Sequence, residues 1–131
     1  MKPRPLLLLL IASLVLLTAC STIGTQTGTL KGTVSIGPVT PVQKGGETPP
    51  APVAEMFTSR GIEILKGGQD RVYKTVHFNA DGTYSVELPE GNYMVRLLST
   101  DMYLADGLPT SVKITSGQDT VLDIHIDTGI R

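Results

Sequence analysis

Apolar and polar residues alternate along most of the chain after residue 30, which is the period of strands that bury one face. Turn sequences rich in Gly, Asp, Asn and Ser interrupt the alternation about every ten residues. The alternating segments predict seven strands, at residues 30–36, 60–66, 71–78, 84–88, 93–97, 112–114 and 122–126. No helical period occurs between them, so we expect an all-β, seven-stranded antiparallel β-sandwich with almost no helix.

The connections between the predicted strands differ in length. Asn79-Ala80-Asp81-Gly82 is typical of a tight hairpin, because Asp-Gly adopts positive φ at little cost. Pro89 and Gly91 set the next turn. Residues 37–55 form a much longer connection with five prolines, which cannot donate to a ladder. We therefore expect this Pro/Gly-rich loop to lie outside both sheets.

The first 19 residues have a different pattern. Lys2 and Arg4 give a basic start, and residues 6–17 are apolar apart from Ser13. As a helix, this run would span about 18 Å, well short of a hydrocarbon core of about 30 Å. A basic start, a short apolar run and small residues before a cut are typical of a secretory signal peptide rather than of a membrane span.

The only cysteine of the chain follows this leader directly, in Leu17-Thr18-Ala19-Cys20. This stretch resembles the lipobox of bacterial lipoproteins, in which the cysteine thiol receives a diacylglyceryl group and the chain is cut just before it. The resemblance implies cleavage between Ala19 and Cys20 and lipidation of Cys20 with acyl chains such as palmitate. Two or more acyl chains hold a protein at a membrane durably. The alternative is a conventional signal peptide and a free cysteine.

An anchored Cys20 also predicts where the protein resides. Residues 20–29 are mostly Ser, Thr and Gly, and are expected to form a flexible tether. The protein would then lie outside the cytoplasm at the bacterial membrane. In lipoprotein sorting of the enterobacterial kind, Ser21 after the cysteine permits delivery to the outer membrane, if the cell has one.

Charge and cysteine content narrow the function classes further. The chain has 11 basic and 12 acidic residues, and removal of the leader takes away Lys2 and Arg4 and no acidic residue. The remainder is acidic overall, so it has no basic field to hold nucleic acid. With Cys20 acylated, no thiol is left for disulfides or metal ligation. No cofactor is expected.

Two sets of residues are candidates for a metal site or a catalytic site. Asp123, His125 and Asp127 alternate along the last predicted strand and would share one face. Successive positions on that face lie about 6–7 Å apart, too wide for one ion, so a solvated outer face is the favoured reading over a metal site. His77 has no evident acid–base partner, and no Gly-x-Ser-x-Gly motif occurs, so no catalytic residue is predicted.

A third set of residues is a candidate binding patch. Apolar and aromatic side chains that would gather on one sheet surface are Tyr73, Met94, Leu98, Met102 and Tyr103. Exposed patches of this kind mark contacts with partners. The alternative is that the Pro-rich loop, or the link of residues 102–108, covers them.

The stretch from Asn79 to Tyr93 reads Asn-Ala-Asp-Gly-Thr-Tyr-Ser-Val-Glu-Leu-Pro-Glu-Gly-Asn-Tyr. It resembles the hairpin of carboxypeptidase-regulatory-like domains, and Gly32-Thr33-Val34 is similar to their first strand. The resemblance implies a transthyretin-like (prealbumin-like) or Ig-like sandwich. Such domains are mostly accessory. The family also contains hydrolases and small-molecule carriers, but the His/Arg/His site of its hydrolases is not matched here.

These observations predict three segments: a signal peptide at residues 1–19, a lipidated tether at 20–29, and a sandwich domain at 30–128. The expected function is a membrane-anchored, non-enzymatic module that binds an envelope protein or polysaccharide. A transthyretin-like hydrolase and a small-molecule carrier are the alternatives.

Overall fold

The predicted β-sandwich is confirmed by the computed structural model, which describes residues 24–39, 50–98 and 104–130. The described strands are β1 (Thr27–Gly37), β2 (Gly61–Lys66), β3 (Val72–His77), β4 (Thr83–Pro89), β5 (Gly91–Leu97), β6 (Leu104–Asp106), β7 (Thr110–Ile114), β8 (Asp119–Val121) and β9 (Ile124–Asp127). One short helix, α2 (Ala54–Thr58), precedes β2.

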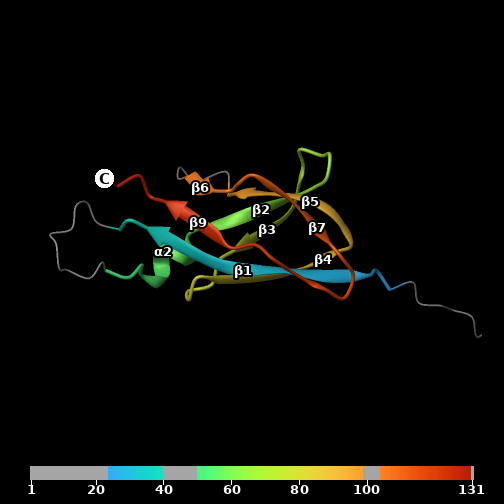
Figure 1. Ribbon diagram of the computed structural model, residues 1–131, viewed down its shortest axis with the longest axis horizontal. Coiled ribbons are helices and arrows are strands. Elements are labelled where there is room, and N and C mark those ends of the chain that lie inside the picture. Colours follow the sequence, from blue (N-terminus) through green and yellow to red (C-terminus); the bar gives the residue numbers. More distant parts are fainter. Residues whose placement is uncertain (1–23, 40–49, 99–103, 131) are drawn as a thin grey trace, which may run out of the picture.

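The strands form two sheets. One sheet has the order β4-β1-β9-β6, with β8 also paired to β1, and the other has the order β3-β2-β5-β7. β1 runs along the long axis of the molecule, so that its first residues and the C-terminal residues lie toward opposite ends (Figure 1). β1 is therefore the strand against which both the middle and the end of the chain assemble.

The alternation seen in the sequence accounts for the core. In β4, every second residue from Tyr84 onward is buried, and the residues between them are exposed. β2 differs, because it lies inside its sheet and is buried on both faces from Gly61 to Leu65. The core cluster consists of buried apolar side chains from both sheets, from α2 and from the residue after β3: Leu30, Val34, Ile36, Phe57, Ile62, Ile64, Phe78, Tyr84, Val86, Leu88, Tyr93, Val95, Ile114, Ile124 and Ile126.

The number and direction of strands differ from the prediction of seven antiparallel strands. The described residues form nine strands, because the expected link contains β6, and because β8 precedes the expected last strand, which begins only with β9 at Ile124. β8 and β9 both pair with β1 in parallel. The reason is the turn before β8: Gly117 N–H donates to the Thr27 carbonyl, so the chain enters β8 beside the start of β1 and then runs in the same direction.

The expectation of almost no helix is confirmed for the described residues, with one helical turn at the end of the Pro-rich loop. Residues 54–58 form one helical turn, in which the Ser59 N–H donates to the Glu55 carbonyl at 3.1 Å. Residues 54–58 do not pair with any described strand, so their backbone groups form hydrogen bonds within the turn instead. The turn places Phe57, which is only 8% exposed, over the end of the core next to Gly82.

Two of the predicted segments, the tether and the leader, can be compared with the residues that the structure describes. β1 begins at Thr27, three residues before the predicted start of the first strand, so the end of the predicted tether belongs to the sheet. The predicted leader, including Ala19, lies outside the described residues, as does Cys20. Within the described part of the chain, no helix has the length and hydropathy needed to cross a bilayer.

Candidate functional site

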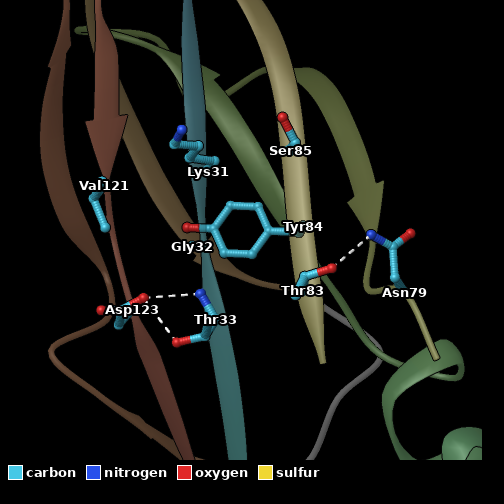
Figure 2. Close-up of a pocket in the computed structure, with 9 residues that line it drawn as sticks. All are labelled: Lys31, Gly32, Thr33, Asn79, Thr83, Tyr84, Ser85, Val121 and Asp123. Atoms are coloured by element: carbon cyan, nitrogen blue, oxygen red, sulfur yellow. Dashed lines mark hydrogen bonds between the residues drawn. The ribbon is translucent and has the colours of Figure 1, made fainter. Parts of the chain in front are cut away.

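A groove of about 350 Å³ lies over β1 and β4 and is open to solvent. Most of its lining residues carry short polar side chains around a bare stretch of backbone at Gly32 (Figure 2), but the surface that they expose to the groove is mainly apolar. The lining residues are Lys31, Gly32, Thr33, Asn79, Thr83, Tyr84, Ser85, Val121 and Asp123. They come from β1, from β4 and the turn before it, and from the region where β8 ends and β9 begins.

Gly32 allows three strands to meet closely beside this groove. The Tyr84 ring extends from β4 toward Gly32 (Figure 2). Its hydroxyl donates to the Leu122 carbonyl at 2.5 Å. A Cβ at position 32 would lie 2.0 Å from the Leu122 oxygen and 3.1 Å from the Tyr84 ring. The Tyr84 ring can therefore pass across β1 at residue 32 only because this residue has no side chain.

This crossing explains why the parallel ladder along β1 is interrupted between β8 and β9. In a regular parallel ladder, the Leu122 carbonyl would accept from the Thr33 N–H. Here the Tyr84 hydroxyl donates to that carbonyl instead, and the Asp123 carboxylate accepts from Thr33 N–H at 2.8 Å and from the Thr33 hydroxyl at 2.9 Å. A carboxylate thus replaces a backbone carbonyl, and the ladder resumes at Ile124.

The same contacts shift two pKa values in opposite directions. The hydrogen bonds from the Thr33 N–H and hydroxyl stabilise the charged carboxylate and lower the pKa of Asp123. Burial raises the pKa of the Tyr84 phenol, and the Asp123 charge adds to this. Tyr84 is therefore a neutral hydrogen-bond donor near neutral pH, and Asp123 is a charged acceptor.

Asp123→Asn is expected to lower stability in a pH-dependent way. Since the native pKa of Asp123 is depressed, its charged form contributes stability at pH values above the ordinary pKa of about 4, and this contribution disappears as the pH falls through the depressed value. Urea unfolding should show the wild type to be more stable than Asp123→Asn near neutral pH, with a gap that closes in acid. Asp70→Asn, an exposed carboxylate, is the control. A gap independent of pH would contradict this assignment.

The other polar side chains of the groove are also held by neighbours. The Asn79 amide donates to the Thr83 hydroxyl at 3.0 Å (Figure 2). Lys31 pairs with Asp119 at 2.5 Å, and both side chains are about half exposed, so the pair adds little stability. This arrangement can offer hydrogen bonds and one cation to a ligand lying in the groove.

The three metal candidates are not brought together. Asp123 precedes β9 and bonds to Thr33, whereas the His125 Nδ1 lies 2.9 Å from the Ser35 hydroxyl. Asp127 accepts from the Gly129 N–H at 2.8 Å. Among the described residues, no three His, Cys, Asp or Glu side chains are grouped so that they could hold a metal ion.

The candidate binding patch is divided between two faces. The register between β2 and β3 shifts at Ile64/Leu65, so that Leu65 lies opposite Val72 and Tyr73 is the extra residue of a bulge. The centroids of the Tyr73 and Tyr93 rings then lie 5.8 Å apart, and Tyr93 belongs to the core. Met94, which follows Tyr93 in β5, points to the other face of the sheet. Tyr73 is 48% exposed and Met94 is 38% exposed.

The remaining patch residues add no contact between these two faces. The Leu98 N–H donates to the Gly61 carbonyl at 2.9 Å, which continues the pairing of β5 with β2. Met102 and Tyr103 lie outside the described residues. On the described residues, Tyr73 and Met94 therefore do not form one continuous patch.

Sequence reasoning missed the ion pair between β2 and β5, in which the glutamate is buried and the arginine is partly exposed. Glu63 is 7% exposed although it alternates with isoleucines, and its carboxylate accepts from Arg96 on β5 at 2.8 Å. The two residues are direct partners in the β2–β5 register. A glutamate in a predicted strand and an arginine three strands later are a recognisable signal only when the strand pairing is known.

No protein-family model and no curated protein matches the chain. Similar solved structures include the Bacillus anthracis TIE protein, at 15% identity and a TM-score of 0.49 over 78% of this chain and 16% of that chain. The minor pilin GBS52 of Streptococcus agalactiae is 14% identical, with a TM-score of 0.49 over 78% of this chain and 44% of the pilin. A DUF3823 family protein from Parabacteroides merdae is 16% identical, with a TM-score of 0.47 over 78% and 46% of the two chains. This chain spans less than half the length of each.

Proposed function

We propose that the chain is an exported lipoprotein, held at a bacterial membrane by a diacylated Cys20. Its β-sandwich serves as a non-enzymatic module that binds an envelope protein or polysaccharide. The observation that carries the proposal is Leu17-Thr18-Ala19-Cys20 at the end of a short apolar leader, followed closely by a folded domain.

The start of β1 supports a short anchor. Thr27 follows Cys20 by seven residues, which span at most about 25 Å when fully extended. A domain on such a tether stays beside the bilayer surface. Its reach is that of a surface-bound module rather than of a long stalk.

The groove over β1 and β4 supports binding rather than catalysis. Its surface is mainly apolar with a few hydroxyl, amide and ammonium groups, a combination that suits a peptide or the ring faces and hydroxyls of a polysaccharide. The one carboxylate in its lining, Asp123, is engaged by Thr33. The same bonds lower the pKa of Asp123, so its carboxylate is a weak base near neutral pH and a poor candidate for a general base.

Cys20→Ala is expected to abolish acylation. Cells fed a palmitate analogue that can be tagged should yield labelled wild-type protein, which enters the detergent phase on phase separation. The Ala variant has no thiol to alkylate, so it should carry no label. Ser21→Ala keeps the thiol and should be labelled like the wild type. An unmodified Cys20 thiol in the mass spectrum of the wild-type protein would refute lipid anchoring.

A further inference from the structure

A second, smaller pocket lies at the turn that joins β2 to β3. Its volume is about 200 Å³, and it is lined by Lys66, Gln69, Arg71, Val72 and Tyr73. Polar atoms dominate this lining, in contrast to the groove over β1 and β4. The pocket takes no part in the function proposed above.

The turn brings two cations to one pocket. Lys66 ends β2 and Arg71 directly precedes β3, and the Gln69 N–H donates to the Lys66 carbonyl at 3.0 Å to close the turn between them. Gly68 has a φ of +78°, a conformation that side chains disfavour, and so makes this tight turn possible. Both cationic side chains therefore border the same small space.

Neither cation is neutralised within the described part of the chain. The ion pairs of the described residues engage Lys31 with Asp119 and Arg96 with Glu63, but not Lys66 or Arg71. Asp70 lies between the two cations in sequence but does not line the pocket. Two unpaired cations at a concave polar surface favour an anionic ligand.

The donors of the pocket match a phosphate group. Arginine presents a planar fork of N–H donors and lysine a compact charge, and both are the usual ligands of phosphate oxygens. The Gln69 amide and the Tyr73 hydroxyl are further donors in the same lining. We propose that this pocket binds the phosphate of a phospholipid headgroup in the membrane that holds the protein.

The position of the pocket supports a membrane lipid as the source of that phosphate. The Gly67 N–H donates to the Asn92 carbonyl at 2.8 Å, and the Glu90 N–H donates to the Gln26 carbonyl at 2.8 Å. The pocket turn, the β4–β5 turn and the residue before β1 therefore lie at one end of the sandwich. Cys20 is six residues before Gln26, so this choice of source rests on the proposed anchoring.

The test uses the full-length protein in a neutral, phosphate-free detergent. Titration with inorganic phosphate should produce a saturable shift of the Gln69 amide signal in ¹H–¹⁵N NMR spectra. The double variant Lys66→Gln/Arg71→Gln should bind at least about tenfold more weakly, because it loses two charged donors. Lys74→Gln/Lys113→Gln makes the same change in net charge outside the pocket and should bind like the wild type. No saturable shift, or an equal loss in both double variants, would overturn the phosphate site.

Two bilayers identify the source of the phosphate. In nanodiscs of phosphatidylglycerol, the Gln69 signal should already be shifted without added phosphate, and in nanodiscs of a neutral galactolipid it should not. A wild-type signal that shifts with inorganic phosphate but not in phosphatidylglycerol would overturn the lipid assignment. Failure of anchoring is separate, because it appears as a missing acyl label on Cys20 and leaves the titration in detergent unaffected.

Discussion

Replacing Gly32 with alanine is expected to destabilise the folded protein by at least about 3 kcal/mol, at the upper end of the cost of overpacking a core. The new Cβ would lie 2.0 Å from the Leu122 oxygen, which is a backbone atom and cannot rotate away. Relief requires β1 to separate from the segment between β8 and β9. That movement also breaks the hydrogen bond from the Tyr84 hydroxyl to Leu122.

Urea unfolding followed by circular dichroism measures this effect. With a slope of about 1–3 kcal/mol per M, the midpoint should fall by about 1 M or more. Gly37→Ala adds the same methyl group to the same strand, where nothing lies within 4 Å of the new Cβ, and should have little effect. Equal midpoints for Gly32→Ala and the wild type would show that the three strands do not meet as described.

Ile64→Ala is expected to cost about 2–5 kcal/mol. Ile64 is fully buried in β2, between β3 and β5, so the three lost carbons leave a cavity that its neighbours cannot readily fill. The free energy of unfolding from urea titration gives the cost directly.

Leu104→Ala is the matched control for this substitution. It removes the same number of carbons from a side chain that is 80% exposed, so its effect should stay within about 0.5 kcal/mol. If the two variants lost similar stability, β2 would not be the central strand of a packed sandwich.

The sequence predicted the core well because burial follows the period of the strand. Tyr84, Val86 and Leu88 point inward as their alternation indicated, and so do Ile124 and Ile126. The inward direction of these side chains can be predicted without knowing which strands pair with one another. A residue pattern with period two is enough to assign the inner face.

The features that depend on pairing could not be predicted in the same way. The bulge at Tyr73, the parallel course of β8 and β9 and the burial of Glu63 all depend on which strand lies beside which. Three residues such as those of β6 give too short a pattern to recognise. The single helical turn of α2 is likewise too short to give a recognisable helical pattern.

The candidate site could be predicted from the sequence only in part. Asp123 was expected on the same face as His125, but its carboxylate lies in a gap of the ladder and bonds to Thr33. Gly32 gave the one usable signal. A glycine inside a predicted strand often marks a close approach of another backbone, and here that backbone is Leu122.

The parallel pairing of β1 with β9 has a consequence for how the chain would mature under the export proposed above. Val34 lies beside Ile124 and Ile36 beside Ile126, so the first strand obtains its last neighbour from the far end of the polypeptide. Pairings between segments so distant in sequence form late. During passage through a translocation channel, β1 would lack its β9 neighbour until nearly all of the chain had emerged. The topology itself thus delays completion of the sheet until almost the whole polypeptide is available to fold.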